Sequence, residues 1–417
     1  MINYGNSFPL IIILVMRVCF VVESIFSFGG VQRVTAVIAK ALAATAKVTI
    51  VTFDAPESYD TTLYELNECP DIEYRFVAYP LVGTAKRHFC KACSYLYRRV
   101  LPQTDLTARL YAHSSFPSEL RRVLIDELNR QSYDAIVGVH APIATRLAAI
   151  KDSLRCKNII GWVHNSFDAM FSPGSWYAGP ELERYFICQF RKLTHTVVLC
   201  HCDVEPYRDK HDFEPTVIYN PLTLKPGTPS KGTSKKFLAI GRFSHLHKGF
   251  DLLIEAFALF AKTDKEWTLD IVGEGPEEHL YWQLICKHQL EARVKLHPFT
   301  NNIQKYYSEA QVYVLSSRWE GFGLVLVEAM AHGLPVVSSD LPTSLEIMGD
   351  FGLYYKNGNV QQLAQRLHDA TRLDWSSKSE EAFQIVRHFD IVTITRQWEQ
   401  LIKCPYRHLS FRRGTRK

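Results

Sequence analysis

The sequence predicts an α/β protein of two Rossmann-like, doubly wound domains that face a central cleft. Short, almost wholly apolar runs alternate along the chain with longer segments of helical spacing. Strands of this kind are buried on both faces, which indicates parallel sheets covered by helices on either side. The length agrees, because 417 residues exceed one ordinary domain and suit two domains of about 200 residues each.

The apolar runs and helical patterns give the expected elements. In the first half the predicted strands are 18–22, 48–53, 135–139, 158–163 and 196–199, and the predicted helices are 31–44, 143–150 and one within 180–193. In the second half the predicted strands are 237–240, 269–272, 294–296, 312–317 and 335–338, and the predicted helices are 249–262, 277–288 and 391–402.

Composition along the chain predicts the domain boundaries. Residues 221–234, PLTLKPGTPSKGTS, are rich in Pro, Gly, Ser and Thr and form the clearest linker. Met16 stands where the first apolar strand begins, so a chain that starts there should fold. The predicted divisions are an N-terminal extension (1–15), a first domain (16–220), the linker (221–234), a second domain (235–390), a last helix (391–402) and a basic tail (403–417).

The net charge of +5 is concentrated in two segments. Residues 403–417 carry six basic residues without an acid, and residues 84–101 carry Lys86, Arg87, Lys91, Arg98 and Arg99 without an acid. Such local charge argues against a nucleic-acid partner and for patches that could meet an anionic membrane surface. As a helix, residues 84–101 would combine these charges with aromatic residues, as interfacial helices do. A solvated surface helix is an equally good interpretation.

Cysteines and apolar segments indicate a cytoplasmic protein. The close pairs Cys90/Cys93 and Cys200/Cys202 have no second pair at zinc-site spacing, so we expect reduced thiols rather than a metal or disulfides. The apolar run 8–22 is interrupted by Arg17 and is too short for a membrane span. It also lacks the order of features of a signal peptide. Peripheral attachment to the inner face of the cell membrane remains compatible with this interpretation.

The most informative segment runs from Ser316 to Asp340, SSRWEGFGLVLVEAMAHGLPVVSSD. Glu320 lies in a glycine-rich turn after an apolar strand, and Glu328 follows eight residues later in an apolar helix. Glycine lets backbone N–H groups approach a ligand, and the next helix N-terminus adds unpaired donors. Glu328 has no polar neighbour within 324–330, so its carboxylate should face a cleft or a partner. The segment therefore predicts a site for a phosphorylated sugar.

Three further motifs precede this segment in the chain. They are 29–34 (GGVQRV), 238–257 (LAIGRFSHLHKGFDLLIEAF), and the pair 269–276 (LDIVGEGP) and 294–299 (VKLHPF). Together the four resemble the retaining nucleotide-sugar glycosyltransferases of family four, whose two-domain fold is called GT-B. The match is dense over 237–354 and thin over 35–218. Any one motif alone would be a weak signal, but four in order are a strong one.

The resemblance implies two sets of site residues. The catalytic set is His164, Arg242, Lys248 and Glu320; the donor-binding set is Gly30, Gly241, Gly273, Phe299, Gly321, Phe322, Gly323, Leu324 and Glu328. In such enzymes two cations stabilise the departing diphosphate, which here would be Arg242 and Lys248. The residue at Glu328 holds the ribose, and the one at Glu320 touches the transferred sugar. The alternatives are a solvated pair of cations and, for Glu320, a charge that acts only on the helix dipole.

His164 follows a predicted strand and should face the cleft, where the family carries a histidine near the donor sugar. A packed, hydrogen-bonded histidine is the alternative, and His140, also at a strand end, competes for the role. Asp105 and the Asp203/Glu205 pair do not resemble the Asp-x-Asp of metal-dependent transferases. We therefore expect no metal and no cofactor, with a nucleoside-diphosphate sugar as substrate. The family also implies that helix 391–402 crosses back to the first domain.

The resemblance implies a retaining transferase that moves a hexose or N-acetylhexosamine from a UDP-sugar to a saccharide acceptor. The acceptor would be lipid-linked, in the biosynthesis of a surface polysaccharide. Two alternatives remain open from sequence: an epimerase of nucleotide sugars with the same fold, and a non-catalytic subunit that binds the nucleotide sugar. Incubation with donors alone would separate the three: an epimerised product would mean an epimerase, slow hydrolysis a transferase, and binding alone a subunit.

Overall fold

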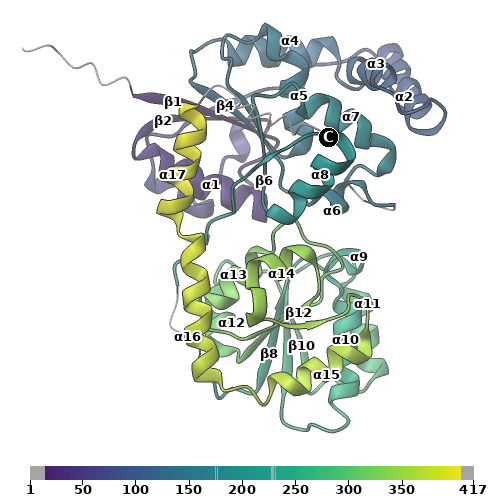
Figure 1. The fold of residues 1–417 in the computed structure, drawn as a ribbon, viewed down its shortest axis with the longest axis vertical. Coiled ribbons are helices and arrows are strands. Elements are labelled where there is room, and N and C mark those ends of the chain that lie inside the picture. Colours follow the sequence, from purple (N-terminus) through teal and green to yellow (C-terminus); the bar gives the residue numbers. More distant parts are fainter. Residues whose placement is uncertain (1–14, 174, 176, 227–229, 231, 405–417) are drawn as a thin grey trace, which may run out of the picture.

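The computed structural model of the chain describes residues 15–173, 175, 177–226, 230 and 232–404. It contains two α/β domains stacked along the long axis of the molecule (Figure 1). The predicted fold class is confirmed, and the predicted strands and helices are present with ends shifted by one or two residues. The expected extension (all but its last residue) and all but the first two residues of the basic tail lie outside the described residues, as does part of the linker.

The first domain has a parallel sheet whose described strands run in the order β3-β2-β1-β4-β5-β6-β7. The strands are β1 (Met16–Val22), β2 (Ala46–Thr52), β3 (Glu73–Phe76), β4 (Ala135–Val139), β5 (Ile159–Trp162), β6 (His195–Val198) and β7 (Thr216–Val217). The central strands β4, β5 and β6 are buried along their whole length, which agrees with their apolar sequences. The edge strand β3 has no buried residue, so its sequence carries no apolar run that would predict it.

Helices cover both faces of this sheet. They are α1 (Gly30–Ala43), α2 (Thr84–Arg99), α3 (Asp105–Ser115), α4 (Ser118–Leu128), α5 (Ala141–Ile150), α6 (Phe167–Phe171), α7 (Pro180–Phe190) and α8 (Val204–His211). The pair α2 and α3 stands at the outer end of the domain, at the upper right of Figure 1. It lies away from the second domain.

The second domain repeats the plan with described strands in the order β10-β9-β8-β11-β12-β13. Its strands are β8 (Lys236–Ile240), β9 (Thr268–Val272), β10 (Val294–His297), β11 (Val312–Leu315), β12 (Val336–Ser339) and β13 (Leu353–Tyr355). Its helices are α9 (His245–Lys248), α10 (Phe250–Phe260), α11 (Glu278–Lys287), α12 (Ile303–Glu309), α13 (Leu324–Met330), α14 (Pro342–Met348), α15 (Val360–Ala370) and α16 (Trp375–Val386).

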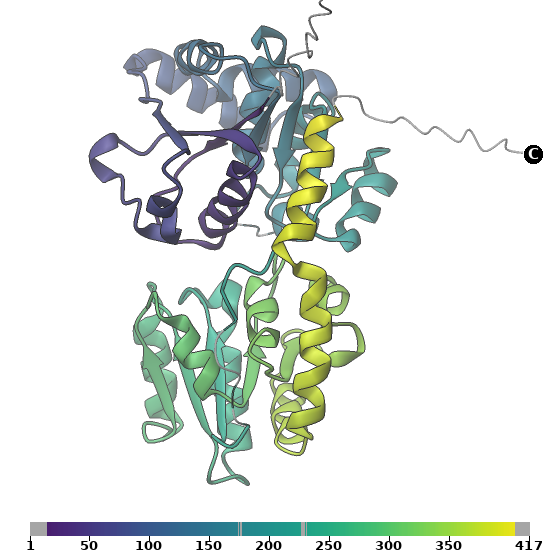
Figure 2. The same ribbon diagram turned by 90° about the vertical axis from the view of Figure 1, so that its left-hand side faces the viewer.

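The last helix, α17 (Ile391–Lys403), returns from the second domain to the first along one side of the molecule (Figure 2). The ring of Trp398 is fully buried, with its centroid 4.7 Å from that of Trp162 on β5. The Asn158 side-chain amide donates a hydrogen bond to the Ile402 carbonyl at 2.9 Å. These contacts attach the chain end to the first domain and join the two domains a second time.

Both sheets reverse their winding direction at one place. In the first sheet this is between β1 and β4, and in the second between β8 and β11. Ligands of doubly wound folds bind outside the carboxyl ends of the strands at such a switch point. Segment 23–30 follows β1, segment 241–248 follows β8 and segment 316–323 follows β11, so three of the four predicted motifs meet there.

Candidate active site

The turn between β11 and α13 is shaped by two glycines. Gly323 has φ +84° at the N-terminus of α13, a backbone conformation that side chains with a Cβ rarely adopt. Gly321 packs against the first domain so closely that a Cβ atom there would lie 2.2 Å from the His164 carbonyl oxygen. The glycines therefore let this turn of the second domain meet the backbone of the first.

Glu320 is buried in this turn, and its carboxylate is paired with the ammonium group of Lys248. Its carboxylate accepts hydrogen bonds from the Lys248 ammonium at 2.6 Å and from the Ser317 hydroxyl at 2.6 Å. Burial alone would raise the pKa of Glu320, but the Lys248 charge and the nearby His247 ring outweigh it and hold the pKa well below its usual range. Glu320 is therefore an ionised carboxylate at neutral pH, paired with a cation.

The segment after β8 supplies the cations. The aliphatic part of Lys248 runs along Gly241, where a Cβ atom would lie 3.0 Å from it. His247 stacks on Trp319 with ring centroids 5.3 Å apart, and burial followed by the Lys248 charge lowers its pKa. Arg242 is exposed at the cleft, and its charge acts on the phenol of Tyr177 in the first domain.

Glu328 is buried on α13, with its side chain 2% exposed, and is held by three segments of the protein. Arg33 on α1 forms an ion pair with it across the domain boundary. The Thr223 hydroxyl donates to Oε1 at 3.0 Å, and the Tyr307 hydroxyl on α12 donates to Oε2 at 3.0 Å. The expectation that this carboxylate needs a partner from outside its own helix is met by residues far away in sequence.

On the first-domain side of the site lie aromatic rings, two of which are uncharged histidines. His164 is buried, with its ring centroid 4.3 Å from that of Trp162 and 6.4 Å from that of His140. Burial, and then the neighbouring His140, hold the pKa of His164 well below its usual range, and burial lowers that of His140 to about 4. The Nε2 atom of His164 has no hydrogen-bond partner among the described residues. Both rings are therefore neutral at pH 7, and His164 keeps a polar atom available.

The structure places most of the other predicted donor-binding residues near the boundary between the two domains. Gly30 abuts Leu324 across the domain boundary, Gly273 abuts the Gly241 carbonyl, and Phe299 contacts Phe28 with ring centroids 4.7 Å apart. Phe322 differs, because its side chain is buried between Tyr219 and Phe389, at centroid distances of 6.1 and 5.7 Å. Its ring anchors the turn, so only its backbone is placed to meet a ligand.

Sequence reasoning missed several residues that the structure brings to the site. They are Arg33, Tyr177, Thr223, His247, Tyr307 and Ser317. Arg33 lies inside the quoted 29–34 motif and was treated only as part of that loop. His247 lies inside the 238–257 motif, and its Nε2 lies 3.8 Å from a Glu320 oxygen. Ser317 lies inside the 316–340 segment but carries no assigned role there, whereas Tyr177, Thr223 and Tyr307 lie in segments without a motif.

One group of described residues has the composition of a metal site. The thiols of Cys200 and Cys202 and a carboxylate oxygen of Glu346 lie within 4.8 Å of one another. The Glu346 carboxylate already accepts hydrogen bonds from two backbone N–H groups, of His201 and Cys202, and from the Tyr219 hydroxyl. It thereby caps a turn of the first domain from α14 of the second, which accounts for its position without an ion.

Parts of this chain are similar in sequence to known proteins. Residues 223–384 match the family model described as Glycosyl transferases group 1. An uncharacterized glycosyltransferase of Haemophilus influenzae is 27% identical over 84% of this chain and 89% of its own length. The lipopolysaccharide core biosynthesis mannosyltransferase LpsB of Rhizobium meliloti is 29% identical over 37% of this chain and 43% of its own.

Among solved structures, Anabaena Alr3699/HepE in complex with UDP-glucose superimposes with a TM-score of 0.70 at 19% identity, covering 92% of this chain and 98% of that one. At this identity the likeness concerns the fold. The two Rossmann-like domains, whose switch points face each other, are the GT-B fold that the sequence predicted. Three of the four motifs, all but 29–34, lie inside the region that matches the glycosyl transferases group 1 model.

Proposed function

We propose that this protein transfers a hexose or N-acetylhexosamine from a UDP-sugar to a saccharide acceptor with retention of anomeric configuration. The product would enter a surface polysaccharide, and the acceptor would be lipid-linked. Two similar proteins support the classes of donor and pathway: Alr3699/HepE was solved with UDP-glucose, and LpsB acts in lipopolysaccharide core biosynthesis.

The observation that carries the proposal is the Lys248–Glu320 pair, with Arg242 beside it at the switch point of the second sheet. A diphosphate leaving group gains negative charge as its bond to the sugar breaks. Two cations aimed at it from a partly buried turn stabilise that charge more in the transition state than in the ground state. Lys248 is held by Glu320 at 2.6 Å, so its ammonium is already positioned before the donor arrives.

Retention is proposed from the groups that face the sugar position. Glu320 is the ionised carboxylate there, and it is bound to Lys248 and Ser317 rather than free to attack. The opposite wall offers neutral His164 and Tyr177. A front-face route, in which the departing phosphate takes the acceptor proton, requires no protein nucleophile. It fits this arrangement.

The test is to incubate the protein with UDP-glucose, UDP-galactose, UDP-N-acetylglucosamine or UDP-N-acetylgalactosamine. UDP release and the anomeric configuration of any product are followed by NMR. The proposal expects slow hydrolysis of one donor and, with a matching acceptor, an α-linked product. An epimerised sugar nucleotide, or an inverted linkage, would overturn it.

We further propose that α2 and α3 hold the enzyme on an anionic bilayer. Apolar side chains on and around this pair are unusually exposed: Leu81, Phe89, Tyr95, Leu96, Val100, Leu106 and Leu110. Arg87, Lys91 and Arg99 are exposed beside them, and each basic residue at such a surface contributes about 1 kcal/mol. Among the described residues no helix is long and apolar enough to cross a bilayer, so the attachment would be peripheral.

The structure decides which charges to reverse. Lys86 is bound to Glu119 at 2.7 Å and Arg98 to Glu181 at 2.7 Å, so neither is free for a membrane. The variant Arg87→Glu/Lys91→Glu/Arg99→Glu should therefore lose sedimentation with anionic liposomes and keep donor hydrolysis. The control Lys262→Glu/Lys287→Glu/Lys295→Glu makes the same charge change on exposed residues of the second domain. Equal loss in both variants would reject this surface.

A further inference from the structure

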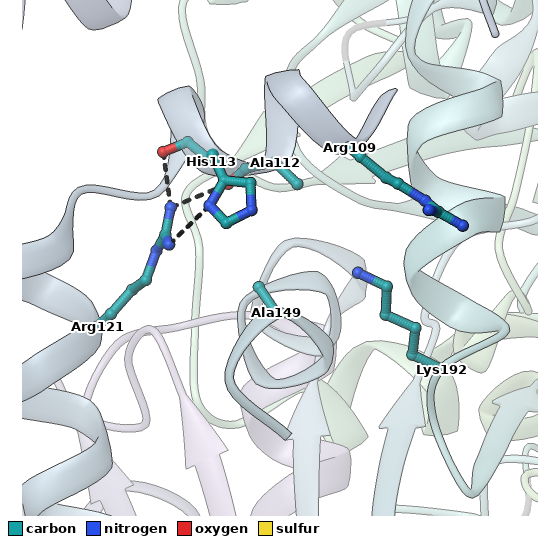
Figure 3. Close-up of a pocket in the computed structure, with 6 residues that line it drawn as sticks. All are labelled: Arg109, Ala112, His113, Arg121, Ala149 and Lys192. Carbon is teal, nitrogen blue, oxygen red and sulfur yellow. Dashed lines mark hydrogen bonds between the residues drawn. The ribbon is translucent and has the colours of Figure 1, made fainter. Parts of the chain in front are cut away.

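A basic cavity lies in the first domain, away from the candidate active site. It has a volume of about 290 Å³ and is lined by Arg109, Ala112, His113, Arg121, Ala149 and Lys192 (Figure 3). Ala149 lies at the carboxyl end of α5 and Lys192 just after α7. Helices of a doubly wound sheet run opposite to its strands, so these helix ends lie at the edge farthest from the carboxyl ends of the strands. The cavity is thus separate from the candidate active site.

The lining has three cationic side chains and no carboxylate. One of them, Arg121, is fixed by the end of α3, because its guanidinium donates to the carbonyls of Phe116 and His113, both at 2.6 Å. It also stands over the Phe116 ring, 5.6 Å from the centroid. Arg121 is therefore a rigid source of positive charge at one side of the cavity.

The same arginine sets the tautomer of His113. One guanidinium nitrogen of Arg121 lies 3.1 Å from His113 Nδ1, as the dashed line in Figure 3 shows. A guanidinium can only donate, so Nδ1 must be the acceptor. In the neutral ring the proton then sits on Nε2. His113 therefore offers an N–H donor on the side of the ring that faces away from Arg121.

The other side of the cavity carries Arg109 and Lys192. Figure 3 shows the Lys192 ammonium reaching toward the Arg109 side chain. Lys192 donates one hydrogen bond, to the Gln189 side chain at 3.1 Å, which leaves two of its three protons for a ligand. Burial lowers the pKa of Lys192 most, the nearby Cys188 thiol and Asp152 carboxylate act against it, and the Arg109 charge lowers it further. No carboxylate among the described residues forms an ion pair with either side chain, so an anion placed between them would relieve their repulsion.

We propose that this cavity binds a phosphate group, held by Arg109, Lys192 and the Nε2–H of His113 over a floor of Ala112 and Ala149. Arginine and lysine form charge-assisted hydrogen bonds to phosphate oxygens, and such bonds are the strong ones in proteins. Two sources share this chemistry, a soluble phosphate and the headgroup of an anionic phospholipid. The exposed Leu106 and Leu110 share the outer face of α3 with Arg109 and His113, which would place lipid chains beside the headgroup.

The experiment uses the full chain and two probes. Inorganic phosphate is titrated by calorimetry in a Lys248→Gln background, which removes the competing cation of the cleft. Vesicles of phosphatidylcholine alone, or mixed with phosphatidic acid, are tested by co-sedimentation. The test variant is Arg109→Gln/Lys192→Gln, and Lys47→Gln/Arg122→Gln is the control that removes two exposed charges outside the lining. Ala149→Glu is a second test variant, which fills the cavity with a carboxylate.

The cavity variants should weaken binding of phosphate, of the phosphatidic-acid vesicles or of both at least tenfold, while the control variant binds as the parent does. Donor hydrolysis, measured in the same variants with Lys248 intact, should stay unchanged. Loss of phosphate binding alone assigns a soluble ligand, and loss of vesicle binding assigns a headgroup. Unchanged binding of both probes in the two cavity variants, or no binding of either probe by the parent protein, overturns the proposal. This outcome is independent of transferase activity, so it leaves the proposed reaction untouched.

Discussion

The two domains share one architecture but meet the cleft with different chemistry. Each sheet reverses its winding at its first strand, and each presents the turn after that strand to the other domain. The second domain brings charge there: the buried Glu320 pairs with the partly buried Lys248, and the exposed Arg242 lies in the same segment after β8. The first domain brings His140 and His164, which burial keeps neutral. The comparison suggests that the second domain handles the charged diphosphate and the first handles uncharged sugar.

The largest expected effect comes from removing charge on the second domain. Lys248→Ala should lower turnover by roughly 100-fold or more, since the ammonium stabilises charge that develops only in the transition state. Arg242→Ala should act in the same direction. Steady-state kinetics on the folded variants measure this, with Lys262→Ala, an exposed residue of the same domain, as control. Near-parental turnover in Lys248→Ala would remove the basis for the division between the domains.

A second test concerns Glu328, a carboxylate of the second domain that forms an ion pair with Arg33 of the first domain. Glu328→Ala should weaken nucleoside-diphosphate binding by roughly 10- to 100-fold, the loss expected for hydrogen bonds to a charged group. Arg33→Met removes the partner from the first domain and keeps the carboxylate. It should lower thermal stability more than nucleotide affinity, which calorimetry and thermal unfolding together resolve. If both variants lose affinity equally, Glu328 acts by holding the domains rather than by binding the nucleotide.

The third test forces apart the two domain backbones where they touch at Gly321 and His164. Gly321→Ala places a Cβ atom 2.2 Å from the His164 carbonyl oxygen, so the backbones must move apart. We expect about a tenfold fall in kcat/KM, because small displacements of positioned groups are costly. Gly83→Ala is the matched control, since a Cβ atom there meets nothing within 4 Å. Equal activity of the two variants would show that the cleft tolerates a looser fit.

The smallest expected effect concerns the neutral histidines of the first domain. Burial lowers the pKa of His140 from 6.5 to about 4, so below pH 6.5 the unfolded chain takes up a proton that the folded protein resists. This group therefore costs stability as the pH falls from 6.5 to about 4, and the cost is constant below that.

His140→Asn should remove this cost. Chemical denaturation at pH 7, 5.5 and 4 would then show the variant gaining stability relative to the parent as the pH falls. His279→Asn, an exposed ring on α11, is the control. A difference between variant and parent that does not change with pH would mean that the His140 ring is not held neutral by the fold.

The sequence by itself determined the fold class and much of the second domain's site. Buried parallel strands require continuous apolar runs, so β4, β5 and β11 were visible as such. The motif around Glu320 could be identified from the sequence because its glycines and carboxylates lie close together along the chain. Edge strand β3 was not visible, because a strand without buried residues needs no apolar run. The basic residues of α2 could be identified from sequence, but the sequence could not show that Lys86 and Arg98 form ion pairs while Arg87, Lys91 and Arg99 are exposed.

Tertiary structure alone decided which residues meet. Arg33 and Glu328 are 295 positions apart, and no local pattern links them. The Phe322 ring turned out to be packed inside, and His247 turned out to lie beside Glu320. The basic cavity needs Arg109 from α3 and Lys192 from the end of α7 to come together. Local sequence carries periodicity and turn chemistry, whereas charge pairing and burial depend on packing between distant segments, which only the folded chain defines.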